Sequence, residues 1–124
     1  MRLGVIGGLG PMATAYFMEL IVNMTDAKRD QDHLEMIVYS CPTIPDRTKY
    51  ILGETATSPV DSMVRIGKEL VELGADYISI PCITAHYFHK ELTGLIKAPI
   101  VDAVMETVKH LREKGIKDAG ILAT

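Results

Sequence analysis

The sequence predicts an α/β fold in which a parallel sheet of about four strands is flanked by helices. Two observations carry this prediction: short runs of continuous apolar residues recur along the chain, and amphipathic helical patterns separate them. Strands that are apolar throughout are buried on both faces, as in parallel sheets covered by helices on each side. We therefore expect strands and helices to alternate strictly, with a strand at each end of the series.

The first half of the chain contains two predicted strands and one long helix. Residues 3–6 are a short apolar run, and the glycine-rich turn at residues 7–11 ends in a proline that suits the first turn of a helix. Apolar residues recur at helical spacing over residues 12–24. After a polar loop, residues 34–39 form the second apolar run. Residues 43–53 follow Pro42, contain Pro45 and are expected to be a loop with room for a short helix.

The middle of the chain continues the alternation. A helix is predicted over residues 58–73, with Ser58 as its N-cap and Gly74 as its stop. The third strand is expected at residues 76–80, and the helical spacing of apolar residues predicts another helix over residues 84–96.

The last part of the chain contains a short fourth strand at residues 99–101 and a helix that Asp102 caps and that runs through residue 114. A fifth strand is predicted to begin at residues 118–122. We interpret residues 1–115 as one α/β lobe and residues 116–124 as the first strand of a second lobe that the chain leaves unfinished. The alternative is an edge strand of a small, complete domain.

Composition excludes several classes of protein. The 124 residues are enough for one domain with its own core, and 48% apolar with 23% charged residues is ordinary for a globular protein. The net charge is only −3, so neither positive nor negative charge dominates the chain. We therefore expect no nucleic acid and no membrane surface as a partner. No apolar run approaches the roughly 18 residues of a membrane span, and no signal-peptide pattern is present. The four histidines lack zinc-site spacing, and two cysteines are too few for a disulfide framework, which favours a reducing cytoplasm.

Cys82 is the most informative residue. It directly follows the third predicted strand and precedes a helical pattern. A thiol at such a junction would lie at a helix N-terminus, where free N–H groups and the helix dipole favour the thiolate. The alternative is a small buried apolar residue, because free cysteines are often buried.

Other chemically useful residues follow the remaining strands. Ligands of parallel α/β sheets bind beyond the carboxyl ends of the strands, where this chain places its glycine-rich turn, Cys41, Arg47 and Asp102. The turn matches neither the dinucleotide nor the P-loop pattern, but its free N–H groups suit a small carboxylate. If the strand order is 2-1-3, Cys41 and Cys82 are about 10 Å apart, too far for a disulfide.

Arg47 and two residues that follow Cys82, Thr84 and His86, each have a functional and a simpler interpretation. Arg47 is either a surface charge or a bidentate carboxylate clamp. Thr84 either caps the helix after Cys82 or holds a carboxylate, and the two roles are compatible. His86 either promotes the Cys82 thiolate by proximity or is a packed or solvent-facing side chain, and Asp102 is most simply a helix cap.

Four segments in register resemble the aspartate/glutamate racemase family, in its aspartate racemase branch. They are residues 4–14, 28–33, 44–48 and 80–87, and together they extend along most of the chain. The resemblance implies the flavodoxin-like lobe of that family and racemisation of an amino acid, aspartate or glutamate first, without pyridoxal phosphate or a metal. It also implies a homodimer.

The resemblance assigns roles to individual residues. Two cysteines, one on each face of the α-carbon, would transfer the proton, and Cys82 would be one of these acid/base thiols. The residues implied to hold the substrate are Met12, Thr14, Ser40, Arg47, Ile83 and Thr84, with Gly10, Cys41 and His86 as minor contributors.

Two departures from the family pattern leave alternatives open. The family usually has Asn after the catalytic cysteine, where this chain has Ile83, so a less polar amino acid is a possible substrate. Family members are about twice as long, and their second cysteine lies in the second lobe. The alternatives are a related cysteine-dependent isomerase or decarboxylase, acting on maleate or arylmalonate, and a non-catalytic carboxylate-binding module. The second thiol would come from Cys41 or from a partner chain.

Overall fold

The computed structural model describes residues 1–122. Its sheet consists of three parallel strands in the order β2-β1-β3. The strands are β1 (Arg2–Gly7), β2 (Glu35–Ser40) and β3 (Tyr77–Ser79). The predicted α/β class, with a parallel sheet flanked by helices, is confirmed.

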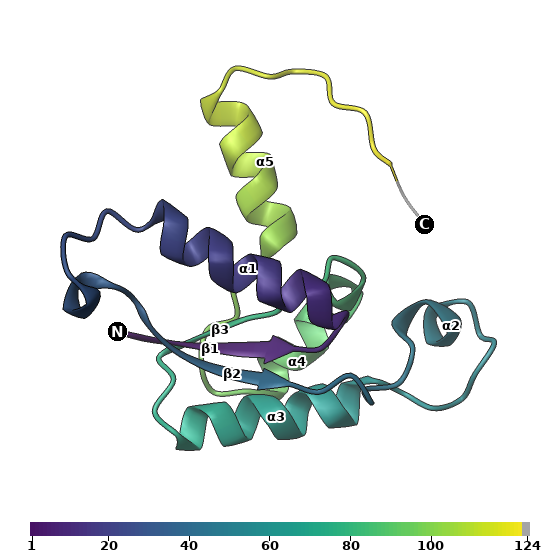
Figure 1. The fold of residues 1–124 in the computed structure, drawn as a ribbon. Coiled ribbons are helices and arrows are strands. Elements are labelled where there is room, and N and C mark those ends of the chain that lie inside the picture. Colours follow the sequence, from purple (N-terminus) through teal and green to yellow (C-terminus); the bar gives the residue numbers. More distant parts are fainter. Residues whose placement is uncertain (123–124) are drawn as a thin grey trace.

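Five α-helices and two short 3₁₀ helices connect and follow the strands in the described residues. The α-helices are α1 (Pro11–Met24), α2 (Arg47–Ile51), α3 (Val60–Glu72), α4 (His89–Leu95) and α5 (Ala103–Glu113). The 3₁₀ helices are η1 (Asp30–Asp32) and η2 (Thr84–Phe88). In Figure 1, α3 and α4 lie on one side of the sheet and α1 on the other, with α5 standing beyond α1.

The main core lies between the sheet and the helices α3 and α4. Its largest completely buried side chains are apolar and come from both layers: Ile6, Met63, Ile66, Leu70, Ile78 and Leu92. Helix α1 contributes little to burial, because Thr14 is its one buried residue. The two faces of the sheet are therefore covered unequally.

The predicted fourth strand is reduced to a single parallel bridge between Ile78 and Ile100. Ile78 donates its N–H to the Pro99 carbonyl at 2.9 Å and accepts from the Val101 N–H at 2.8 Å. Pro99 has no N–H to extend the ladder, and Asp102 already caps α5, so no room remains for a longer strand.

Two other predicted elements differ. The helix expected over residues 84–96 is divided into η2 and α4. The fifth strand expected at residues 118–122 is absent: no backbone hydrogen bond within residues 1–122 joins this segment to the sheet. The last two residues of the proposed second-lobe segment lie outside the described residues, and the division at residue 115 stays a prediction. No described helix combines the length and the apolar character that crossing a membrane requires.

Candidate active site

The carboxyl ends of the three strands form the edge at which the predicted site residues gather. Gly7 pairs with Ser40 across the β1–β2 ladder, and Val5 pairs with Ser79 across the β1–β3 ladder. The Cys41 N–H extends the contact by donating to the Gly7 carbonyl at 3.0 Å. The loops that carry the two cysteines therefore leave the sheet on opposite sides of β1.

Cys82 lies in a tight turn between β3 and η2. Its thiol is free and partly buried, and its side chain packs against the core. The Cys82 carbonyl accepts from the Ala85 N–H at 3.2 Å, which begins the 3₁₀ helix. The prediction of an α-helix directly after Cys82 is therefore wrong. The bonds here join residues three apart, so the thiol precedes a five-residue 3₁₀ helix with little aligned dipole.

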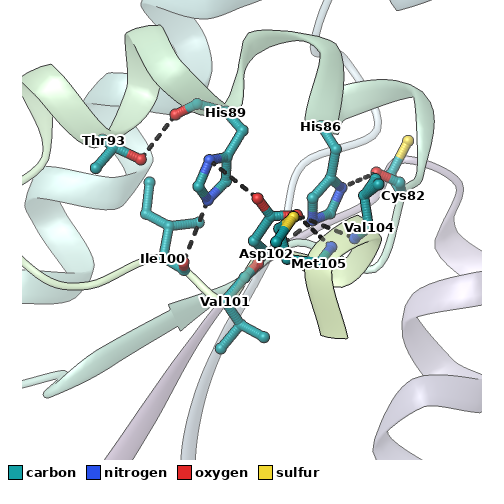
Figure 2. Close-up of polar contacts among 9 residues, drawn as sticks. All are labelled: Cys82, His86, His89, Thr93, Ile100, Val101, Asp102, Val104 and Met105. Carbon is teal, nitrogen blue, oxygen red and sulfur yellow. Dashed lines mark hydrogen bonds and ion pairs between the residues drawn. The ribbon is translucent and has the colours of Figure 1, made fainter. Parts of the chain in front are cut away.

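His86 contacts the backbone of Cys82 and not its sulfur. Its Nδ1 lies 2.9 Å from the Cys82 carbonyl oxygen, and its Nε2 lies 3.3 Å from the Val101 carbonyl oxygen. Figure 2 shows the Cys82 sulfur pointing away from the imidazole. This geometry gives His86 no direct path to the thiol proton.

Asp102 caps α5, as predicted, and also lies beside the histidines. Its carboxylate accepts from the N–H groups of Val104 and Met105, both at 3.0 Å. The Met105 N–H, together with the nearby His89 and His86, holds the pKa of the Asp102 carboxyl below its usual range.

Arg47 begins helix α2, which Asp46 caps. The Asp46 carboxylate accepts from the Lys49 N–H at 2.9 Å, and this bond is the main reason that the Asp46 pKa is lowered. The Arg47 Nη1 donates to the carbonyl oxygens of Pro45 at 3.1 Å and Ile44 at 3.4 Å. Its Nε is shielded from solvent and has no hydrogen-bond partner among residues 1–122. A guanidinium whose Nη1 is held by backbone carbonyls has a fixed orientation, and its planar set of N–H donors is suited to an anion.

A groove of about 490 Å³ separates α2 from the turn that follows Cys82. Its lining consists of Thr48, Ile51, Ile83, Thr84, Tyr87, Ile121 and Leu122. Helix α2 is kept close to η2 by the rings of Tyr50 and Phe88, whose centroids are 5.8 Å apart. The structure thus places Ile83 and Thr84 next to the helix that carries Arg47, although Cys82 and Arg47 themselves do not line the groove.

Several site residues have roles that the sequence did not indicate. Thr84 caps no helix, because η2 has Ile83 at its N-cap position and no side-chain cap. Thr14 is buried, accepts from the Gly8 N–H at 2.9 Å and donates to the Gly10 carbonyl at 3.3 Å. Its hydroxyl is therefore engaged within the β1–α1 turn, and its contact with a substrate stays a prediction.

The remaining predicted residues lie along the same edge. Met12 is 81% exposed in the first turn of α1, whose N-cap Gly10 provides no side-chain cap. Ser40 is exposed at the end of β2. The Cys41 sulfur lies 3.4 Å from the Thr43 hydroxyl. No hydrogen bond within the described residues joins the Cys82 thiol to any of the predicted substrate-binding side chains.

Four residues of this region were not predicted. Thr48, Ile51 and Tyr87 line the groove, and His89 pairs with Asp102 at 3.7 Å. A signal existed for three of them: Thr48 and Tyr87 each end one of the motif segments, and His89 lies one helical turn after His86. Ile51 has only the apolar character of many core residues.

Comparisons with known proteins agree with this architecture. The Asp/Glu/hydantoin racemase family model matches residues 6–124. The broad specificity amino-acid racemase RacX of Bacillus subtilis is 30% identical over 127 aligned residues, which cover 98% of this chain and 54% of RacX.

Two solved structures are similar in fold. The aspartate racemase of Picrophilus torridus superposes with a TM-score of 0.85 at 37% identity, covering 92% of this chain and 48% of that protein. An aspartate racemase homologue from Pyrococcus horikoshii has a TM-score of 0.77 at 20% identity, covering 92% of this chain and 50% of its own, and shows the likeness of the fold. The chain thus spans about half the length of these relatives.

Proposed function

This chain belongs to the Asp/Glu/hydantoin racemase family, and from that premise we propose that Cys82 transfers the α-proton of an amino acid in a racemisation that needs no cofactor. The observation that supports the proposal most is the arrangement at the sheet edge. A free thiol lies in the turn before η2, and η2 packs against the helix whose first residue, Arg47, has an unpartnered Nε.

The proposed reaction follows from the chemistry of the α-proton. The Cys82 thiolate takes the proton, so an S–H bond forms while the Cα–H bond breaks and its electron pair delocalises into the substrate carboxylate. That carboxylate carries additional negative charge in the transition state. The Arg47 guanidinium and the uncapped N–H groups at the start of α1 are suited to stabilise it.

Inversion requires a second proton donor on the opposite face of the α-carbon. One thiol cannot reach both faces of a substrate that is held in place. We propose that a second thiol from outside the Cys82 turn returns the proton. Cys41 is the candidate within the chain, and a thiol of another lobe or of a partner chain in a cytoplasmic homodimer is the alternative.

The substrate proposed is an amino acid less polar than aspartate. Ile83 is 66% exposed and lines the groove together with Ile51 and Tyr87, so this wall offers mainly apolar contacts. A side chain of aspartate or glutamate would lose hydration there without gaining an ionic partner from Ile83. The backbone carboxylate, which every amino acid has, would still bind near Arg47.

The test is α-proton exchange in D2O. The chain is incubated separately with L-aspartate, L-glutamate, L-leucine and L-methionine, and the α-proton signal is followed by NMR together with chiral chromatography. We expect exchange that Cys82→Ser abolishes. Exchange that survives Cys82→Ser would refute the proposal.

Cys41→Ser is the matched control. If it removes inversion while exchange continues, Cys41 is the second donor. If it changes neither, the second donor comes from elsewhere. Saturable binding by calorimetry without any exchange would favour a non-catalytic carboxylate-binding module instead.

A further inference from the structure

Two histidines, His86 in η2 and His89 at the start of α4, join the part of the chain that follows Cys82 to a segment that is distant in sequence (Figure 2). His86 lies between the carbonyl oxygens of Cys82 at 2.9 Å and Val101 at 3.3 Å. His89 lies between the carbonyl oxygen of Ile100, 3.3 Å from its Nε2, and the carboxylate of Asp102, 3.7 Å from its Nδ1. Each ring therefore contacts the 100–102 segment.

The partners of the two imidazole rings indicate a structural role rather than a role in proton transfer. Carbonyl and carboxylate oxygens only accept hydrogen bonds, so a ring nitrogen that bonds to one of them must carry a proton. A neutral imidazole has one such N–H and donates to one of its two neighbouring oxygens, whereas an imidazolium donates to both. No contact within residues 1–122 presents a donor to either ring, and the two rings stack with centroids 6.1 Å apart and planes 5° apart. A proton acceptor poised for catalysis would need a free ring nitrogen aimed at the reacting group. The histidines instead act as cross-links between backbone segments.

The cross-links end on rigid structure. Asp102 is itself fixed by the N–H groups at the start of α5, and Ile100 is buried and bridges to Ile78 in β3. On the other side, the His86 bond ends on the carbonyl of Cys82, the residue that carries the thiol. A shift of that carbonyl rotates the peptide plane and moves the sulfur.

We infer that His86 and His89 are positioning residues: His86 holds the Cys82 turn against the 100–102 segment, His89 holds the start of α4 against the same segment, and together they fix the direction of the thiol. The purpose of this positioning rests on the proposed function, in which the Cys82 thiol transfers a proton. The positioning itself is testable without any substrate.

The test is the rate at which iodoacetamide alkylates each cysteine, followed by mass spectrometry of the peptides. Cys82 packs against the core, so loosening the turn exposes it. We expect His86→Ala to raise the Cys82 rate about three- to tenfold, the factor for losing one ordinary hydrogen bond. Asn carries its amide nitrogen near the position of Nδ1 and keeps the bond to the Cys82 carbonyl. In His86→Asn, the logarithm of the Cys82 alkylation rate should therefore return at least halfway from the His86→Ala value to that of the unchanged protein.

Two controls separate positioning from general destabilisation. Cys41, on the other side of β1, reports global opening in the same sample and should keep its rate. Thr93→Ala removes a hydroxyl that bonds within α4, to the His89 carbonyl at 2.8 Å, and should leave the Cys82 rate unchanged.

Three results would overturn the inference. The first is a Cys82 alkylation rate that is unchanged or lower in His86→Ala, and the second is an equal Cys82 rate in the Ala and Asn variants. The third is an alkylation rate of Cys41 that rises by the same factor as that of Cys82. Because no amino acid is turned over, failure here leaves the racemase proposal to its own assay. Loss of α-proton exchange in Cys82→Ser would stand even if His86 proved dispensable for positioning.

Discussion

Replacing Gly8 by Ala tests whether close backbone contact holds the site edge together. Gly8 adopts φ +91°, a region that L side chains rarely occupy. A Cβ at this position would lie 2.5 Å from both the nitrogen and the carbonyl carbon of Cys41, and 2.7 Å from the nitrogen of Pro42. These are backbone atoms, so no rotamer change relieves the overlap.

The expected loss of unfolding free energy in Gly8→Ala has two parts. The positive φ costs about 1–2 kcal/mol for a residue with a Cβ. The overlap forces the Cys41 loop to move, and overpacking of this kind typically costs about 1–3 kcal/mol more. The free energy of unfolding should therefore fall by about 2–5 kcal/mol, a large part of the roughly 5–15 kcal/mol of a typical domain.

Gly53→Ala is the matched control. Gly53 has φ +75°, but a Cβ at this position would have no neighbouring atom within 4 Å, so the substitution isolates the conformational part. Both substitutions change the unfolded chain alike, and that contribution cancels between them. Urea unfolding followed by circular dichroism measures both. If Gly8→Ala is destabilised by no more than Gly53→Ala, within about 0.5 kcal/mol, the contact between the two loops does not constrain the edge.

Three further predictions concern binding, pH and the core. Arg47→Lys should weaken binding of an amino acid about tenfold or more, because Lys lacks the planar guanidinium and its Nε donor. Isothermal titration calorimetry measures the affinity, and an unchanged affinity would mean that Arg47 does not contact the ligand. The lowered pKa of Asp102 means that its stabilising effect is complete above the unfolded-state pKa of about 3.9 and is lost as the pH falls through the lower folded-state value. Stability should thus decrease on acidification below about pH 4, and Asp102→Asn should flatten that slope in urea titrations between about pH 2 and 6; an identical slope would contradict the linkage. Leu92→Ala, at a side chain with 0% exposure, should cost about 2–5 kcal/mol in unfolding free energy, and a cost near zero would mean that α4 does not seal this core.

Local signals in the sequence were sufficient for most of the fold. Each of these signals involves residues within a turn or two of one another. They are the apolar runs of β1 and β2, the proline at the start of α1, and the caps at Asp102 and Gly74. Such patterns constrain the backbone wherever the segment lies, because hydrogen bonding of a helix end and burial of a continuous apolar strand are local requirements. The parallel order of the strands also followed, since helices connect them.

The identity of the candidate site was partly predictable. The motif segments alone pointed to Cys82, Arg47 and Thr84, and the parallel sheet predicted that their loops share one edge. The sequence alone could not show that Thr14 turns its hydroxyl into the β1–α1 turn, because the Gly8 N–H that it satisfies belongs to a loop of specific shape.

Contacts between distant segments were decided by the tertiary structure alone. His86 could have faced the thiol, the core or solvent, and it faces Val101, fifteen residues further along the chain, only because the bridge at Ile100 brings that segment beside the turn. The same bridge replaces a fourth strand, since Pro99 and the Asp102 cap leave no length for one. Local patterns in the sequence were enough to locate most of the elements and the reactive groups that they carry. The tertiary structure decided what each group contacts, because a side chain's partners depend on packing between elements that no local pattern encodes.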